Sequence, residues 1–361
     1  MEAEKFSYNL EEGRQLWLTT SPQDTTLPKL WDNVYKYIFD HCDLPDPELY
    51  DVLTSWVLCT WVAPKFPVTT YLKMIAPKSS GKTRVLDTLY QLCFRAIKSS
   101  TLSPPSVYRI LEKWDLTLIL DETERYLKDD DMLGILNAGY KKGDYAIRVT
   151  DPIKNELGLY KTLGFKALAG TEELRDTLES RCIVINMQKS IRPVRFTMDE
   201  KRGAELRGNL MYASSHLLNN LNELNDLPEA LEFSNGRFAE LYSPLVHMGE
   251  YCGHSENIVK YAEDVWEAYQ DEEEVSVEAQ VLIALISAEK CIEGNPGRIS
   301  TTHVTDFFNM NRSVRESWKP SSIGRVLTRM GFRPKRLNNG RKGYLYSRPR
   351  INRLKERYNV E

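Results

Sequence analysis

Two short motifs constrain this chain more than any other feature. The first, at residues 76–83, reads Ala-Pro-Lys-Ser-Ser-Gly-Lys-Thr, and the second, at 116–122, reads Leu-Thr-Leu-Ile-Leu-Asp-Glu. The first matches a phosphate-binding loop, with Ala where Gly more often opens the pattern. The second is an apolar strand that ends in two adjacent carboxylates. In this order, the two motifs predict a site for a nucleoside triphosphate and magnesium.

The residues around the first motif have the order that such a loop needs. A Ser- and Gly-rich turn before a helix presents backbone N–H groups and the positive end of the helix dipole to a phosphate chain. Segment 69–75 is apolar and β-branched, as in a buried strand, and apolar residues at helical spacing follow in 84–96. The pattern assigns Lys82 to the β- and γ-phosphates and the Thr83 hydroxyl to Mg²⁺. The predicted nucleotide-binding residues are Ala76, Pro77, Lys78, Ser79, Ser80, Gly81, Lys82 and Thr83.

The acidic pair completes the predicted chemistry. Asp121 stands where a magnesium carboxylate belongs, and Glu122 is predicted to polarise the attacking water. The expected activity is ATP hydrolysis, with ATP and Mg²⁺ as the bound groups. The alternative is a chance loop beside a strand that ends in an acidic surface turn, which would require several separate features to coincide.

Composition bounds the class of protein. A chain of 361 residues has room for more than one domain, and 42% hydrophobic with 27% charged residues is ordinary for a soluble globular protein. The longest apolar stretch, around residues 52–62, contains Thr54, Ser55 and Thr60 and is too short to span a bilayer. The N-terminus carries no secretory leader pattern. The expected location is therefore cytoplasmic, without membrane contact.

Charge is distributed unevenly along the chain. Residues 296–361 hold sixteen Lys and Arg against four Asp and Glu, whereas the preceding 295 residues hold 32 against 47. An acidic body with a basic end predicts a polyanion-binding module joined to the rest of the protein. A solvated basic tail without a partner is the alternative.

Strands that alternate with helices predict an α/β fold with a mostly parallel five-stranded sheet and helices on both faces. The expected strands are 69–75, 96–103, 116–120, 164–171 and 181–187. Segment 143–161 reads as strand, turn and strand, which predicts a hairpin. The expected parts are a helical lead-in (1–64), the nucleotide-binding core (65–198), a helical lid or linker (199–293) and a basic C-terminal domain (294–361).

The C-terminal segment has the pattern of a winged helix. Helix signals at 302–309 and 322–330 precede Asn339-Gly340, a strong hairpin signal between two strand-like runs. Arg325 and Arg329 share one face of the second helix. Salt-sensitive contacts to DNA phosphates are expected from this domain, although packing on the core or on a partner protein is the alternative. The predicted DNA-binding residues are Arg325, Arg329, Lys335, Arg336, Arg341 and Lys342.

Taken together, these motifs resemble the AAA+ ATPases, and in detail the minichromosome maintenance (MCM) helicase group. They are most similar to the MCM-like helicases carried by mobile genetic elements and phages. The resemblance covers about residues 65–361 and includes the loop, the acidic pair, the hairpin at 143–161 and the winged helix. The large N-terminal DNA-binding domain of cellular members has no counterpart in this sequence.

The resemblance implies further roles. Thr171 ends a strand where the family places sensor 1, usually Asn. Segment 176–181 resembles the Leu-Ser-Arg element and makes Arg181 an arginine finger for a neighbouring subunit. Segment 235–240 resembles the sensor 2 region, with Arg237 as the candidate, and hairpin residue Lys154 would contact DNA. For each of these three basic residues, an ordinary surface role is the alternative.

The implied function is a DNA helicase or translocase in mobile-element replication. It would act as a homo-oligomeric ring, a hexamer, with single-stranded DNA in the pore and duplex DNA at the winged helix. Two other functions stay open. One is an ATP-dependent loader or remodeller of DNA-bound proteins. The other is a non-motor DNA-binding initiator switched by ATP, against which Glu122 argues, since a switch needs no water-activating carboxylate.

Overall fold

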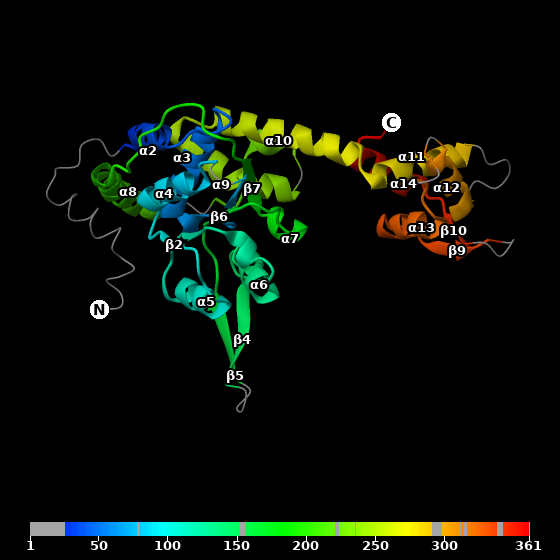
Figure 1. Ribbon diagram of the computed structural model, residues 1–361, viewed down its shortest axis with the longest axis horizontal. Helices are drawn as coiled ribbons and strands as arrows, with labels where there is room; N and C mark the ends of the chain where they lie inside the picture. The colour runs from blue at the N-terminus through cyan, green and yellow to red at the C-terminus, as the bar shows by residue number, and fades with distance from the viewer. Residues whose placement is uncertain are drawn as a thin grey trace. The chain divides into compact units, whose positions relative to one another are not determined.

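The computed structural model describes residues 26–77, 80–151, 156–220, 224–234, 236–290, 298–310, 312–313, 316–337 and 342–360. The chain divides into two compact units, Met1–Glu263 and Asp264–Glu361, called here the N-terminal and C-terminal units. The boundary between them falls within helix α10 (Glu256–Glu274) (Figure 1).

A five-stranded parallel sheet organises the N-terminal unit. Its strands lie in the order β2-β3-β6-β1-β7, so β6 separates the two strands that precede the sequence motifs. All pairings in this sheet are parallel, and therefore the segments that follow β1 and β3 leave at the same edge. The five predicted strands are confirmed: β1 (Tyr71–Ile75), β2 (Ile97–Ser99), β3 (Leu118–Leu120), β6 (Lys166–Gly170) and β7 (Cys182–Asn186).

Helices cover both faces of this sheet. Thr70 and Tyr71 are adjacent in an extended segment, so their side chains point to opposite faces. The Thr70 hydroxyl donates to the carbonyl of Leu241 in α9 (2.6 Å), and the Tyr71 hydroxyl donates to that of Leu136 in α6 (2.7 Å). Both faces being covered explains why β1 is a nearly continuous apolar run rather than an alternating one.

The helices of the N-terminal unit agree closely with the predicted segments. The predicted helix after the loop ends early, at Leu92, because Cys93 is extended and Arg95 has a positive φ of 43°. The helices are α2 (Leu27–His41), α3 (Leu49–Trp61), α4 (Lys82–Leu92), α5 (Pro104–Lys113), α6 (Asp130–Ala138), α7 (Asp176–Glu179), α8 (Glu200–Asn220) and α9 (Gly236–Cys252). Short 3₁₀ turns lie at η1 (Ala63–Lys65), η2 (Thr123–Arg125) and η3 (Glu229–Leu231).

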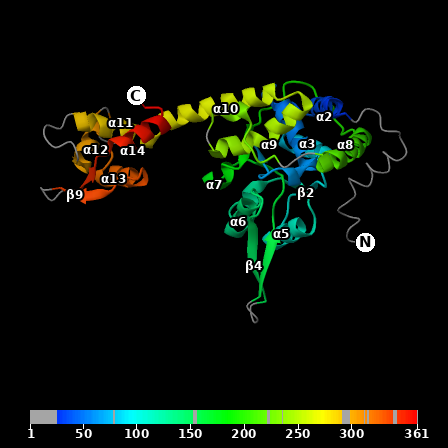
Figure 2. The same ribbon diagram turned by 180° about the vertical axis from the view of Figure 1, so that it is seen from behind.

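The predicted hairpin is present as a separate two-stranded antiparallel sheet, β4 (Tyr145–Asp151) and β5 (Glu156–Lys161). It projects from the sheet of the N-terminal unit, with α5 and α6 beside its base in both views (Figures 1 and 2). One side packs on α5, where the rings of Tyr108 and Tyr160 lie 4.4 Å apart. The tip, with Lys154, lies outside the described residues.

The other side of this hairpin is apolar and exposed. Cross-strand partners share a face, and the pairs Ile147–Leu159 and Val149–Leu157 stand opposite one another. These four side chains are 56–62% exposed, and Tyr145 on the same strand is 51% exposed. Because alternate residues of a strand share a face, Tyr145, Ile147 and Val149 form one stripe. We call these five residues the apolar hairpin face.

The C-terminal unit has its own hydrophobic core. Buried side chains from α11, α12, α13, α14, β8 and β10 form a single cluster. The predicted order of helix, helix and hairpin is present, and the sequence analysis did not anticipate β8 and α14. The four-part division of the chain stays a prediction; α11, which it assigned to the lid, packs in this core. The elements are α11 (Val277–Lys290), β8 (Arg298–Ser300), α12 (Thr301–Asn309), α13 (Pro320–Arg329), β9 (Pro334–Arg336), β10 (Lys342–Leu345) and α14 (Arg348–Arg357).

The parallel sheet, the loop after β1 and the acidic pair after β3 together make the α/β P-loop core of an AAA+ protein, as predicted. Within the described ranges, no helix has both the length and the apolar character that crossing a bilayer demands.

Candidate nucleotide site at the edge of the sheet

The loop after β1 has the backbone of a phosphate-binding turn. Gly81 has a φ of 84°, a left-handed conformation that glycine adopts without a steric penalty, and α4 begins at the next residue. The Ser80 hydroxyl donates to the Pro77 carbonyl (2.8 Å) and closes the turn. Lys78 and Ser79 lie outside the described residues. The start of α4 therefore faces the loop with its N–H groups, as an anion site needs.

Lys82 holds its ammonium group over this loop. The group donates to the carbonyl oxygens of Ala76 and Pro77, the latter at 3.2 Å. Partial burial lowers the pKa of Lys82, and the carboxylates of Glu124 and Asp121 act in the opposite direction. The loop thus carries a cation whose present hydrogen-bond partners are carbonyl groups, which phosphate oxygens can replace as stronger acceptors.

Thr83 and Asp121 meet although they come from different strands. The Thr83 hydroxyl donates to Asp121 Oδ2 at 3.1 Å, and Asp121 Oδ1 accepts from the Glu122 N–H at 2.9 Å. A hydroxyl and a carboxylate at this distance are hard oxygen ligands of the kind that Mg²⁺ takes beside a phosphate chain. These residues therefore fit the magnesium ion that the sequence predicts.

Glu122 has an uncommon backbone conformation. Its φ of 52° and ψ of 46° are left-handed, which is rare for a residue with a side chain and is found at functional sites. Its carboxylate lies 3.0 Å from the Arg125 guanidinium, and both side chains are about half exposed or more. Such an exposed ion pair is weak. The Glu122 carboxylate can therefore leave Arg125 when a reacting water requires it.

A second carboxylate, not predicted as functional, lies deeper in the site. Glu124 Oε1 is 3.5 Å from the hydroxyl of Thr171, the predicted sensor 1 residue, at the end of β6. Glu124 Oε2 is buried and has no hydrogen-bond partner within the described part of the chain. A buried carboxylate oxygen without a partner is costly, so its position requires a functional explanation.

Lys73 is a further residue that the sequence reasoning missed. It is fully buried in β1, and its ammonium donates to the Thr123 hydroxyl at 2.7 Å. Burial lowers the pKa of Lys73 to about 8, and Glu124 acts in the opposite direction. A Cβ at Gly170 would come within 2.6–2.9 Å of Thr123, Glu124 and Lys73, so only glycine leaves room for this cluster. The available signal was a lysine within an apolar strand, since lysine is rarely buried without a partner.

Arg181 and Arg237 lie together, away from the loop of their own chain. The Cζ atoms of Arg181 and Arg237 are 5.7 Å and 5.2 Å from the centroid of one ring, that of Tyr140. Burial raises the pKa of Tyr140 to about 12. Arg181 also donates to the Thr177 carbonyl, while its buried Nε has no partner within the described residues. The structure thus groups the predicted finger and the predicted sensor 2 residue on a single aromatic support.

The predicted DNA-binding residues of the C-terminal unit differ in their surroundings. Arg325, Lys335, Arg336 and Lys342 are exposed. Arg329 is ion-paired, with its guanidinium 2.8 Å from Glu278 in α11. Arg341 lies outside the described residues. Arg329 therefore points toward α11.

No family model and no curated protein matches this chain. Among solved structures, the active Cch helicase of SCCmec type IV shares 12% identity over 89% of this chain and 71% of that chain, with a TM-score of 0.47. The JCV helicase shares 16% identity over 69% and 66%, with a TM-score of 0.31. Cdc6p from Pyrobaculum aerophilum shares 12% over 91% and 97%, with a TM-score of 0.22. Similarities this low carry no argument about function, which rests on the site itself.

Proposed function

We propose that this chain is an ATP-dependent DNA motor of the AAA+ type, a helicase or translocase that hydrolyses ATP at the subunit interfaces of a ring. One observation carries the ATPase assignment. Thr83 of the loop and Asp121 of the acidic pair meet at 3.1 Å, beside the ammonium of Lys82. Two distant segments are thereby combined into one set of magnesium and phosphate ligands.

Each residue of the site has a role that follows from its chemistry. Bound magnesium supplies positive charge that offsets the charge on the phosphate oxygens. Thr83 and Asp121 hold the ion, and Lys82 with the N–H groups of the loop binds the phosphates. Glu122 orients the attacking water and accepts its proton. Thr171, fixed by Glu124, is positioned to donate a hydrogen bond where the γ-phosphate ends.

Arg181 supports hydrolysis at a subunit interface. It precedes β7 and sits beside the amino end of β1, whereas the loop follows the carboxyl end of that strand. Its guanidinium is therefore unsuited to its own loop and suited to the site of a neighbouring copy. An arginine supplied by a neighbour accelerates phosphoryl transfer by on the order of 10³–10⁵ in known cases. We propose that the ring is a hexamer and that Arg237 faces the same neighbour.

The DNA part of the proposal rests on charge and on the hairpin. The basic C-terminal unit would bind duplex DNA through its second helix and wing, and the β4–β5 hairpin would face single-stranded DNA in the pore. Replication of a mobile genetic element is the biological setting that the motif resemblance implies.

A second function is favoured by the apolar hairpin face. Five large apolar side chains on one exposed face are more typical of contact with protein than with DNA. A loader or remodeller that uses ATP to act on DNA-bound proteins would use such a surface directly.

Steady-state ATP hydrolysis with and without single-stranded DNA tests the proposal, with Lys82→Ala as the blank. Strong stimulation by DNA is expected of a motor, because hydrolysis is then coupled to strand contact. Hydrolysis that is indifferent to DNA favours the remodeller. Binding of ATP without any hydrolysis contradicts both and favours an ATP-switched initiator.

A further inference from the structure

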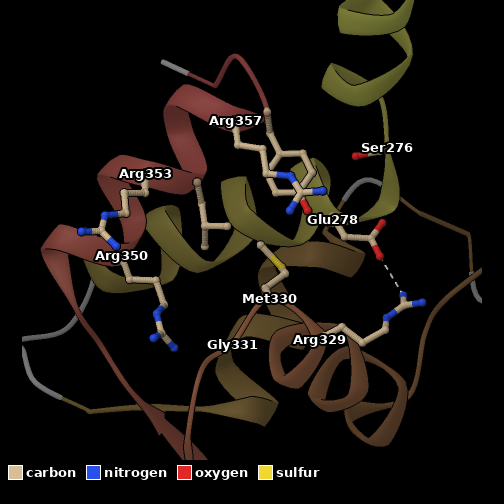
Figure 3. A pocket seen from close by; sticks show the side chains of 10 residues that line it. Ser276, Glu278, Arg329, Met330, Gly331, Arg350, Arg353 and Arg357 are labelled. Atoms are coloured by element: carbon tan, nitrogen blue, oxygen red, sulfur yellow. Dashed lines mark ion pairs between the residues drawn. The ribbon is translucent and has the colours of Figure 1, made fainter. Parts of the chain in front are cut away.

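The C-terminal unit contains an arginine-lined cavity. It is open, has a volume of about 550 Å³, and lies between α13, α14 and the start of α11 (Figure 3). Arg329 comes from α13, while Arg350, Arg353 and Arg357 come from α14. Glu278, paired with Arg329, is the acidic residue among the lining side chains. Four guanidinium groups against one carboxylate leave a strongly positive cavity.

Helix α14 is built to present these arginines. Arg350, Arg353 and Arg357 follow a spacing of three and four residues, which places them along one side of the helix. Ile351 and Tyr358 are buried in the core of the unit and fix how the helix is turned. In Figure 3 the three α14 side chains surround the apolar floor around Met330.

Two of these guanidinium groups are supported by aromatic rings. Arg350 Cζ lies 5.9 Å from the centroid of Phe332, and Arg357 Cζ lies 5.2 Å from that of Tyr358. A guanidinium that rests on a ring still donates hydrogen bonds through its edge. The rings therefore hold the groups in place at a small cost in side-chain entropy. Such edges suit phosphate oxygens, which they can bind through two parallel hydrogen bonds.

The spacing of the arginines indicates a polymer of phosphates. Seven residues of α-helix from Arg350 to Arg357 rise by about 10.5 Å, at roughly 1.5 Å per residue. One strand of DNA carries a phosphate about every 3.4 Å of axis, so this distance matches roughly three consecutive phosphates. We propose that the arginine cavity binds the backbone of a nucleic-acid strand, in addition to the predicted second helix and wing. The apolar floor of Met330 and Leu354 contacts the sugars.

The inference rests on the DNA-acting part of the proposed function and not on ATP hydrolysis. Binding is therefore measured on the full chain without nucleotide, by fluorescence anisotropy of a labelled 20-nucleotide single strand and the matching duplex. Salt is varied from 50 to 200 mM. An inactive ATPase leaves this measurement unaffected, so failure of the ATPase proposal and failure of this one are separate results.

The test variant is Arg350→Gln with Arg353→Gln. Its matched control is Arg348→Gln with Lys355→Gln, which removes the same charge from the same helix outside the cavity lining. The cavity variant is expected to bind single strands at least tenfold more weakly at 100 mM salt. The slope of log affinity against log salt should fall by about 1.4, at ~0.7 per lost phosphate contact. The control should change affinity less than threefold. Equal loss in both variants, or loss in neither, overturns the proposal.

Two further measurements keep the result decisive. If the double variant melts at a lower temperature than the wild type, Arg353→Glu alone decides, because this side chain is exposed and its replacement spares the core. It should weaken DNA binding, and unchanged binding overturns the proposal. Poly-glutamate of equal charge and inorganic phosphate serve as competitors. Weak displacement of DNA by both is expected, and displacement as effective as that by unlabelled DNA would identify a general anion site instead.

Discussion

The backbone N–H of Tyr71 donates a hydrogen bond to the carbonyl of Arg181, with 3.0 Å between the two atoms. Tyr71 begins β1, and the phosphate-binding loop follows the other end of the same strand. Five residues of strand, about 16 Å at roughly 3.3 Å per residue, therefore separate Arg181 from the loop of its own chain. An arginine in this position can complete an ATP site only if another subunit provides the loop.

This arrangement predicts that Arg181 acts between subunits. Arg181→Ala should lower hydrolysis by on the order of 10³-fold while ATP still binds. Mixing it with Glu122→Gln subunits should restore activity, because about one interface in four then combines an intact Glu122 with an intact Arg181. Steady-state hydrolysis at several mixing ratios measures this. Arg175→Ala, which removes a nearby exposed arginine paired with Asp130, serves as the control. No rescue at any ratio would count against the finger.

The two carboxylates after β3 should separate in kinetics. Glu122→Gln should bind ATP and lose turnover by 10²-fold or more, because the general base is gone. Glu124→Gln should lower kcat less, by roughly tenfold, since Glu124 acts by positioning Thr171 and does not accept the proton. ATP affinity and kcat are measured separately for both variants. Turnover retained in Glu122→Gln but abolished in Glu124→Gln would transfer the base role to Glu124.

Lys73 should make stability depend on pH. Its pKa is lowered to about 8 by burial, whereas an unfolded lysine titrates near 10.4. Below pH 8 the lysine is protonated in both states and the full burial penalty is present. Above pH 8 the native state releases the proton while the unfolded chain keeps it, so stability rises with pH. Between pH 7 and 9.5 the free energy of unfolding should gain about 2 kcal/mol from this group.

Denaturant unfolding of the wild type and of Lys73→Met, each at pH 7 and pH 9.5, isolates this contribution. Other titrating groups are common to both proteins and cancel in the double difference. Lys73→Met is expected to lack the gain between the two pH values. An identical pH dependence in both proteins would mean that Lys73 keeps its proton throughout the range.

The sequence predicted the core of this fold because its signals are local. The loop pattern, the apolar run before Asp121 and the spacing of apolar residues are each contained in short segments, and every predicted strand of the main sheet is present. Strand order was not predicted, since placing β6 between β1 and β3 depends on long-range pairing.

What the sequence could not predict depends on contacts between distant segments. Lys73, Glu124 and Gly170 come from three strands or turns, and their cluster exists only after the sheet forms. The shared position of Arg181 and Arg237 on Tyr140 is of the same kind. Helix α14, in contrast, could have been found, because a Pro in its first turn and apolar residues Ile351, Leu354 and Tyr358 at helical spacing are visible in the sequence.

The apolar hairpin face should be covered in the proposed ring. An isolated two-stranded hairpin is only marginally stable in water, and here just one of its faces packs on α5. We expect a neighbouring copy to cover the other face. Burying Ile147 and Leu159 would stabilise each interface by about 3 kcal/mol or more, which corresponds to over a hundredfold in the association constant.

Ile147→Ser with Leu159→Ser tests this expectation. Since both side chains are more than half exposed in the single chain, the melting temperature of the monomer should change little, while assembly measured by sedimentation should require far higher protein concentration. Ile191→Ser with Phe196→Ser is the control, because it removes two apolar side chains that are 93% and 89% exposed elsewhere. If assembly is unchanged but stimulation of hydrolysis by single-stranded DNA is lost, the face meets DNA and not a neighbouring subunit.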